Sequence, residues 1–380
     1  MNARSARSAA LLAGLCVACS PGAAAAQAAD VPVASTLLRG FTDSGRVNVR
    51  SVVEDWTLPL PGDASLGVHW NNERVTIPGI SAAPGSSEAV DAVTTASRPI
   101  AGNPYQEYVK TRNEVQGDFS RGHAAASYYI SSESDYLAQQ LGANLIREYR
   151  DQQFNVSVGT SYGWDDITPQ ANAAVQAPSN TKRTLHWNAV ATEILSPTTL
   201  LRWGLEYNIV SGLQHNPYRN VFAGGTYVPE RHPEHRERRD TFLRLNQYLP
   251  NRATVKLNYR LYNDDWGITS HELGTVLSQY ITHGLAANYE YRYYTQTHAS
   301  FYRDEYATAG GIDGYLSGDY RMNALASHLL GASLRMDMEA LAVGHRFLGR
   351  TAVWLNYQRY FNSNNYSANI LETGLDLRFR

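Results

Sequence analysis

Two short motifs place a pair of aspartates beside a tryptophan, and their carboxylates are the first candidates for chemistry. The motifs are Trp164-Asp165-Asp166 and Asp264-Asp265-Trp266. Paired carboxylates can hold a cation or share a proton for acid-base work. At the end of a strand the same residues more often have a structural role, in which aspartate caps a turn and tryptophan anchors the chain at a membrane interface. We favour the structural role.

Histidines next to acidic residues are the second candidates. They are His271 with Glu272, and the run His232-Pro233-Glu234-His235. The first pair suits acid-base catalysis, and the second run has the residue types of a metal site. However, the segment 230–239 is a run of mixed charge, which is typical of a solvated loop. No strand gathers an acid, a base and a nucleophile, so we predict no catalytic residue, no metal site and no cofactor. A hydrolase at the rim of an outer-membrane barrel stays as an alternative.

The segment 253–298 shows which elements position these residues. Its apolar and polar side chains alternate strictly, as in Val255-Lys256-Leu257-Asn258-Tyr259-Arg260. Only a β-strand turns a period of two into two different faces. The alternation returns in 285–296, after the short turn Thr282-His283-Gly284. We expect consecutive antiparallel strands joined by short turns at one end and longer polar segments at the other.

The polar face of these strands carries long ladders of charged and amide side chains, which a soluble β-sandwich rarely shows on many successive strands. A membrane barrel explains them, because its apolar face meets lipid and its polar face meets a watery lumen. The residues predicted to face the lumen are Arg202, Glu206, Arg244, Lys256, Arg260, Glu290, Arg292, Tyr294, Glu372, Asp376 and Arg378. Their charges either stiffen and fill the interior or line a polar pore. Two long segments, 78–104 and 214–236, are long enough to plug it.

The count of alternating segments gives the fold class, an all-β, antiparallel, up-and-down transmembrane barrel of about sixteen strands. An even number returns both termini to one side, the periplasm. The last strand supports this, because Leu371, Leu375 and Phe379 alternate with polar residues up to an aromatic that only Arg380 follows. Such an end is similar to the signal that barrel-assembly machinery recognises. We further expect a strand over 240–249, a long loop over 299–319, a strand over 321–338 and an inner connection over 339–350.

The first 28 residues have the pattern of a cleaved secretory signal peptide, with Arg4 and Arg7, an apolar run and then small residues. The remaining residues, 29–380, are expected to form a single barrel domain in the outer membrane of a Gram-negative bacterium. Both cysteines, Cys16 and Cys19, lie in the signal, so the mature chain is predicted to have no disulfide. A lipoprotein acylated at Cys19 is the alternative.

The composition of the chain limits the classes of function and fold that it can have. The formal net charge of −2 argues against binding nucleic acid, which needs a basic surface. The chain has 25 tyrosines against 9 phenylalanines, and tyrosine suits membrane interfaces and polar lumens because only one end of it is apolar. The length of 380 residues fits one large barrel as well as two soluble domains.

Several ordered motifs resemble a bacterial family known as domain-of-unknown-function family 3570. The residues that carry the resemblance are Val93-Thr94-Thr95-Ala96-Ser97, Gly163-Trp164-Asp165-Asp166, Asn216-Pro217-Tyr218-Arg219, Tyr262-Asn263-Asp264-Asp265-Trp266-Gly267-Ile268 with His271, Tyr291 to Gln296, Phe301-Tyr302 and Ser327-His328 with Leu330-Gly331. The resemblance covers most of the mature chain. It implies an outer-membrane barrel and no particular activity.

The expected function is therefore a porin-like channel for ions or small polar solutes. Its expected partners are outer-membrane lipid and the barrel-assembly machinery, and nucleic acid is excluded. A second possibility is a barrel that serves as a scaffold for a periplasmic redox or secretion partner. The sequence has no Cys-x-x-Cys-His motif, so any electron carrier would belong to that partner.

Overall fold

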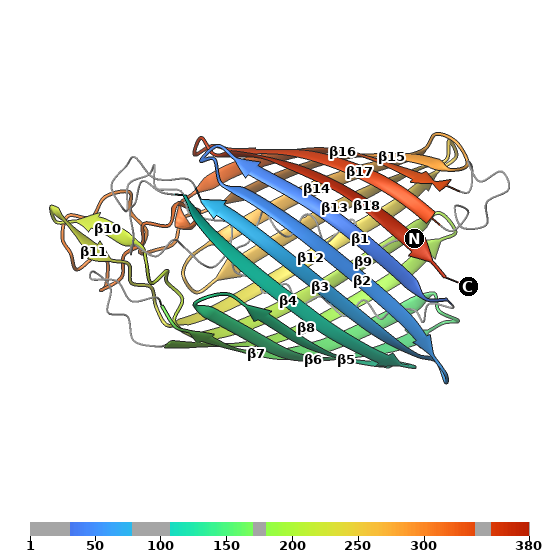
Figure 1. Ribbon diagram of the computed structural model, residues 1–380, viewed down its shortest axis with the longest axis horizontal. Coiled ribbons are helices and arrows are strands. Elements are labelled where there is room, and N and C mark those ends of the chain that lie inside the picture. Colours follow the sequence, from blue (N-terminus) through green and yellow to red (C-terminus); the bar gives the residue numbers. More distant parts are fainter. Residues whose placement is uncertain (1–30, 78–106, 170–179, 339–350, 380) are drawn as a thin grey trace.

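The structure is a computed structural model that describes residues 31–77, 107–169, 180–338 and 351–379. In this part of the chain, sixteen antiparallel strands close into one barrel (Figure 1). The barrel strands are β1 (Val33–Asp43), β2 (Asn48–Leu60), β3 (Ala64–Ile77), β4 (Tyr108–Arg121), β5 (Ala124–Ser132), β6 (Tyr136–Tyr149), β7 (Phe154–Ile167), β8 (Asn180–Ser196), β9 (Thr199–Gly212), β12 (His235–Leu249), β13 (Ala253–Asp264), β14 (Thr269–Tyr280), β15 (Leu285–Gln296), β16 (Leu325–Asp337), β17 (Thr351–Asn362) and β18 (Ser367–Arg378).

The barrel is an up-and-down meander in which each strand pairs with its neighbours in the sequence. The one interruption lies between β9 and β12, which pair directly although β10 and β11 separate them in the sequence. The first residue of β1, Val33, pairs with the last residue of β18, Arg378, so the two terminal strands meet and leave no open edge. Both terminal strands therefore begin or end at the same end of the barrel, which we call the short-turn end.

The outward face of the wall is apolar, as the alternation predicts. Trp203 and Leu205 of β9 are 46% and 55% exposed, whereas Gly204 between them is buried. Aromatic rings also stack along the outward face, for example Trp187 on Tyr207 with their centroids 5.9 Å apart. Such a face is costly in water and suits lipid tails with an aromatic belt. None of the described residues forms a helix long and apolar enough to cross a membrane.

The seam between the first and last strands is held by polar contacts on the inward face as well as by the backbone. Ser35 donates a hydrogen bond to Asp376 over 2.6 Å, and the Arg39 guanidinium lies 2.6 Å from the Glu372 carboxylate. Arg335 of β16 reaches the other oxygen of Asp376, also at 2.6 Å. Because these side chains are mostly buried, each charge depends on its partner.

A tryptophan packs against a glycine on the neighbouring strand near the same seam. Gly374 of β18 lies opposite Trp354 of β17, and a methyl group added at Gly374 would fall 2.3 Å from the indole ring. We expect Gly374→Ala to destabilise the barrel by about 1–3 kcal/mol, because the ring must leave its position. Equilibrium urea unfolding in micelles measures this. Gly117→Ala, where the added carbon meets nothing within 4 Å, is the matched control. Equal stability of the two variants would show that the ring moves freely.

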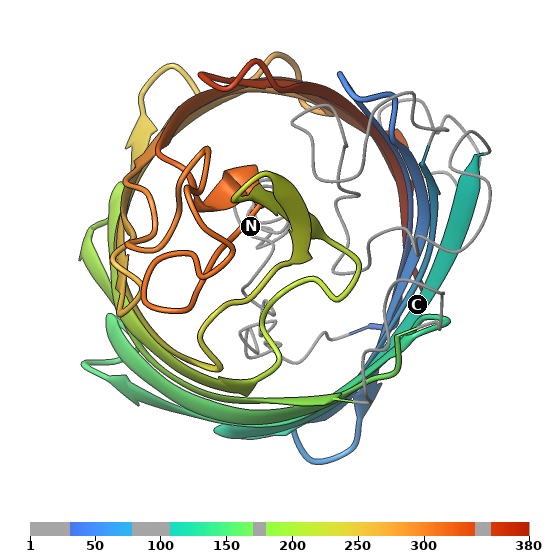
Figure 2. The ribbon, with the colours of Figure 1, turned by 90° about the vertical axis from the view of Figure 1, so that its left-hand side faces the viewer.

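Two long connections at the other end of the barrel pack together. Residues 213–234 contain the hairpin of β10 (Asn220–Ala223) and β11 (Thr226–Pro229), and residues 297–324 contain the short 3-10 helix η2 (Tyr320–Met322). We call these two segments the loop cap. Figure 1 shows the hairpin beyond the strand ends, and Figure 2 shows both segments across the mouth of the barrel when it is viewed end-on.

The segments of the loop cap join through backbone and apolar contacts. Isolated β-bridges pair Ala223 with Tyr306 and Arg231 with Leu316. Val221 is buried with Ala223, Tyr306 and Leu316 in one small apolar cluster. The cap is thus a packed unit with its own core, and the two connections do not behave as separate solvated loops.

The observed boundaries correct three predictions. The strand predicted to begin at residue 240 begins at His235, and the strand predicted from 321 begins at Leu325 because residues 320–322 form η2. The segment predicted as a long loop over 214–236 contains a hairpin. The predicted signal peptide over 1–28, the loop over 78–104 and the connection over 339–350 lie outside the described residues.

Candidate functional site

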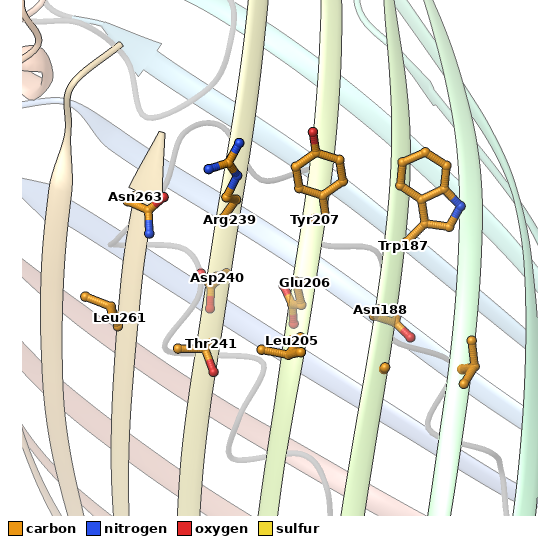
Figure 3. A pocket seen from close by; sticks show the side chains of 12 residues that line it. Trp187, Asn188, Leu205, Glu206, Tyr207, Arg239, Asp240, Thr241, Leu261 and Asn263 are labelled. Carbon is orange, nitrogen blue, oxygen red and sulfur yellow. The ribbon is translucent and has the colours of Figure 1, made fainter. Parts of the chain in front are cut away.

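The inward face of the barrel wall carries the charged residues that the alternation of apolar and polar residues in the sequence predicts to face the lumen. In each strand these side chains occupy the positions between the outward apolar ones. Residues in these positions are Arg202, Glu206, Arg244, Lys256, Arg260, Glu290, Arg292, Tyr294, Glu372, Asp376 and Arg378. Arg378 is the last residue of β18 and is exposed. Figure 3 shows how closely the two faces alternate, with Glu206 next to Tyr207 and Asp240 next to Arg239 on neighbouring strands.

Most inward charges in the half of the wall nearer the loop cap are paired across strands. The Arg260 guanidinium lies 2.5 Å from Asp240 and 3.7 Å from Glu206. Arg292, which is almost fully buried, lies 3.4 Å from Glu272. Pairs of this kind compensate the loss of water around each charge and also fix the strands in register.

The motif at 264–266 forms a structural joint beneath the loop cap. The Asp264 carboxylate is completely buried and accepts hydrogen bonds from Arg236 (2.9 Å from Nε) and from the Tyr262 hydroxyl (2.7 Å). Arg236 also lies over the Trp266 ring, 4.1 Å from its centroid. Asp265 accepts a bond from the backbone N–H of Glu237 over 3.0 Å. The two aspartates therefore bind different partners and do not form a shared cation site.

The motif at 164–166 is also divided between the two faces of the wall. Trp164 stacks on the outward Tyr162, with centroids 5.9 Å apart. Asp165 points inward, where it lies 2.8 Å from the Lys182 ammonium, and Asp166 is exposed on the outward side. Neighbouring residues of a strand point to opposite faces, so the paired carboxylates cannot act on one ligand.

The same geometry separates His271 from Glu272. His271 is exposed on the outward face, and its Nδ1 lies 2.9 Å from the Tyr259 hydroxyl. Glu272 points inward to Arg292. The two residues therefore do not form an acid-base pair, and the His271 ring belongs to the outward aromatic belt.

The mixed charges suggested a solvated loop, but residues 230–236 do not form one. Glu230 and His232 are 1% and 6% exposed, and the His232 imidazole lies 3.1 Å from the Glu230 carboxylate. His235, three residues later, contacts a different acid, Glu237, over 3.5 Å. No three metal-binding side chains gather anywhere among the described residues. The run 232–235 therefore does not assemble a metal site.

Glu230 is the centre of a buried ion cluster that joins the two segments of the loop cap. The Arg219 guanidinium lies 3.3 Å from Glu230 and 3.1 Å from Asp319. The Ser317 hydroxyl donates to Glu230 over 2.6 Å. Burial alone would raise the pKa values of the two carboxyls, but Arg219 and His232 lower the pKa of Glu230, and Arg219 and Arg321 lower that of Asp319. Both carboxylates therefore stay ionised well into the acid range.

The loop cap is also tied to the barrel wall. The Tyr218 hydroxyl donates a 2.7 Å hydrogen bond to Asp135, which lies between β5 and β6. The other oxygen of Asp135 lies 2.5 Å from the Lys110 ammonium of β4. All three residues are buried, so this contact fixes the cap to the part of the rim between β5 and β6.

Sequence reasoning missed a serine, a histidine and an asparagine that follow one another across the inner wall. Ser161, in the run Gly159-Thr160-Ser161-Tyr162-Gly163, has the Gly-x-Ser-x-Gly spacing of a nucleophile elbow and lies opposite His186. His186 Nδ1 lies 2.6 Å from Asn208. However, Ser161 accepts its hydrogen bond from Gln140, no described bond joins it to His186, and the run lies in an extended strand where an elbow needs a sharp turn. The row is a polar ladder of the wall.

The closed wall, its apolar exterior and its charged interior define the class of this protein as a transmembrane β-barrel of the outer-membrane type. Within this class, residues 19–360 match the model of the family described as "Protein of unknown function (DUF3570)". The match spans most of the chain, so the protein belongs to this family. No curated protein matches the chain.

Solved structures with a similar fold are outer-membrane proteins of low sequence identity. CdiB from Acinetobacter baumannii is 8% identical, with a TM-score of 0.51 over 92% of this chain and 60% of CdiB. A loop L8 deletion mutant of OmpT, an outer membrane protein of Vibrio cholerae, is 9% identical, with a TM-score of 0.43 over 92% of this chain and 100% of that chain. OpdK of Pseudomonas aeruginosa, solved with vanillate, is 9% identical, with a TM-score of 0.38 over 92% of this chain and 98% of OpdK.

Proposed function

We propose that the protein is a porin-like channel that lets ions or small polar solutes cross the outer membrane. The observation that carries this proposal is the inner wall, where charged and amide side chains face inward on successive strands while apolar side chains face outward. A lumen that excluded water would leave such a wall unsolvated. A barrel of sixteen strands is also wide enough to hold water between its walls.

The loop cap gives this channel a narrowed entrance on the side opposite the strand termini. With both terminal strands at the short-turn end, that end faces the periplasm and the cap faces outside. The cap crosses the mouth in the end-on view and is fixed to the rim through Tyr218 and Asp135 (Figure 2). Solutes therefore pass beside the cap, and its charges meet them before those of the wall.

Single-channel conductance of the refolded protein in a planar bilayer under a salt gradient tests the proposal. We expect steady openings, and we expect Arg260→Ser and Arg292→Ser to shift the reversal potential toward cation selectivity. Each substitution removes a cation and leaves its acidic partner, Asp240 or Glu272, uncompensated in the lumen. Arg239→Ser is the matched control, because Arg239 is on the outward face of the same wall and its side chain is 64% exposed.

A protein that is shown to be folded and does not conduct would overturn the channel proposal. The barrel would then act as a closed scaffold, and a periplasmic partner should co-purify with it. If Arg239→Ser moved the reversal potential as far as Arg260→Ser, the effect would come from surface charge and not from the lumen.

A further inference from the structure

Three cations of the inner wall lie on neighbouring strands and form no ion pair with any described residue. They are Arg202 of β9, Arg244 of β12 and Lys256 of β13. Arg238 of β12 forms none either, but it is six residues from Arg244, nearer the loop cap. Within the described part of the chain, the Arg244 guanidinium donates only to the neutral Asn258, over 3.0 Å. Arg202 Nε is buried and has no hydrogen-bond partner among the described residues. A wall built only for stability would not leave cations in this state.

The strand register brings these cations together. Arg202 lies directly opposite Arg244, and Arg244 is diagonal to Lys256 across the next strand pair. The β carbons of directly opposite residues are about 4.5–5.5 Å apart, and like charges in such pairs are destabilising. The residues directly opposite this group on neighbouring strands are Thr192, Asn246, Asn258 and Val276, which are neutral. Arg260 is also diagonal to Arg244, but it pairs with Asp240 and Glu206. The nearest acid on the same strand as Arg202 is Glu206, which already faces Arg260 at 3.7 Å.

The packing around Arg244 holds its charge in place. Its guanidinium lies over the Phe242 ring, 4.7 Å from the centroid. The Phe242 ring in turn covers Gly204, where an added methyl group would fall 2.6 Å from the ring. The Phe242 ring therefore supports the Arg244 guanidinium, whose position is set before any ligand binds.

We propose that Arg202, Arg244 and Lys256 form an anion-binding site on the inner wall near the short-turn end, suited to the oxygens of a small carboxylate or phosphate. Arginine binds such oxygens with two parallel hydrogen bonds, and an anion between the three cations removes their mutual repulsion. Lys256 and Arg202 are each three residues from the first residue of their strand, so the site lies within about 10 Å of strand length from that edge. The site rests on the channel proposal only for its role in transport, since it would select anions from the solutes that pass.

Titration calorimetry of the refolded protein in neutral detergent micelles tests binding without conduction. The probes are trisodium citrate, inorganic phosphate and sodium acetate at low ionic strength. We expect citrate or phosphate to bind in preference to acetate, and we expect Arg202→Gln and Arg244→Gln each to weaken that binding by about tenfold. The control is Arg239→Gln, which removes the same charge from the outward face of β12. Separate titrations with citrate and with phosphate show whether the site prefers carboxylate oxygens or phosphate oxygens.

Thermal unfolding distinguishes a loss of anion binding from a loss of folded structure. If the cations repel one another in the free protein, Arg202→Gln should unfold at the same or a higher temperature than the wild type while it loses citrate or phosphate binding. A wild-type protein that binds neither probe, or variants that bind as well as the wild type, would overturn the site. Binding that depends on Arg202 and Arg244 in a barrel that does not conduct would keep the site and overturn the channel. If the protein conducts but Arg202→Gln and Arg244→Gln bind the probes as well as the wild type does, the channel proposal is kept and the anion site is overturned.

Discussion

Arg39→Met is expected to destabilise the barrel by about 3–5 kcal/mol, one of the two largest effects of a single substitution that we foresee. The Glu372 side chain is only 1% exposed, and the Arg39 guanidinium lies 2.6 Å from it at the seam between β1 and β18. Without the arginine, the buried carboxylate keeps a single hydrogen bond among the described residues, from the neutral Asn356 at 2.9 Å. Equilibrium urea unfolding in micelles, followed by the heat-dependent gel mobility of the folded barrel, measures the loss.

A double variant separates the missing charge from the lost packing. Arg39→Met combined with Glu372→Leu removes both charges, and we expect it to recover most of the stability, because an apolar pair replaces a buried ion pair at little cost. Arg50→Met, on the exposed outward face of β2, is the control and should change stability by less than about 0.5 kcal/mol. An Arg39→Met barrel as stable as this control would mean that water reaches Glu372 at the seam.

The barrel could be predicted from the sequence because lipid and lumen impose opposite chemistry on alternate residues. This rule holds through β9, where Trp203 and Leu205 face outward and Arg202 and Glu206 face inward. It fails at the start of β12, where Arg238 and Arg239 are both charged and no alternation of apolar residues is visible. At this part of the strand the outward Arg239 is exposed and the inward Arg238 is buried.

The loop cap could not be predicted because its order comes from contacts between segments far apart in the sequence. Glu230 and Ser317 are 87 residues apart, and neither position has a periodic pattern around it. The aspartate motifs, in contrast, can be found in the sequence and lie at structurally important positions. Asp264 is buried and held by Arg236, and Trp266 packs against His232 and Phe301 of the cap, so the family motif marks the joint between wall and cap. The structural interpretation predicted a turn-capping aspartate, and Asp264 does accept a bond from the backbone N–H of Ile268. Its prediction of a tryptophan at the membrane interface is wrong for the buried Trp266.

Arg219→Met is expected to release the loop cap from its closed position, and this is the second large effect. Glu230 and Asp319 are both buried and both share Arg219, so its loss leaves two carboxylates with less compensation. Breaking a buried ion pair on one side costs about 3–5 kcal/mol, which corresponds to a hundredfold or larger rise in the open population. Amide hydrogen exchange in the β10–β11 hairpin measures this opening, and exchange in β13 of the barrel wall serves as the internal reference.

The pH dependence of the cap follows from the same charges. The pKa values of Glu230 and Asp319 are lowered in the folded cap, so their contribution to stability is full above the unfolded values of about 4 and falls as the pH drops below them. Burial and the neighbouring His232 also lower the pKa of His215, which disfavours its protonation and weakens the cap as the pH falls below about 6.5. Acid should therefore open the wild-type cap in two stages.

Variants separate the two stages of this acid response. Arg219→Met should reduce the lower stage, because the pKa of Glu230 is then lowered mainly by His232 and that of Asp319 mainly by Arg321, whereas His215→Gln should remove only the stage near pH 6.5. Arg231→Met is the matched control for lost charge in the cap, because the Arg231 side chain is exposed and, among the described residues, bonds only to the backbone oxygen of Ala309. Hairpin exchange that stays slow in Arg219→Met at pH 7 would show that apolar packing of Val221, Ala223, Tyr306 and Leu316 holds the cap by itself. In that case the buried ions would specify how the two segments align, and the free energy that keeps them together would come from the small apolar core.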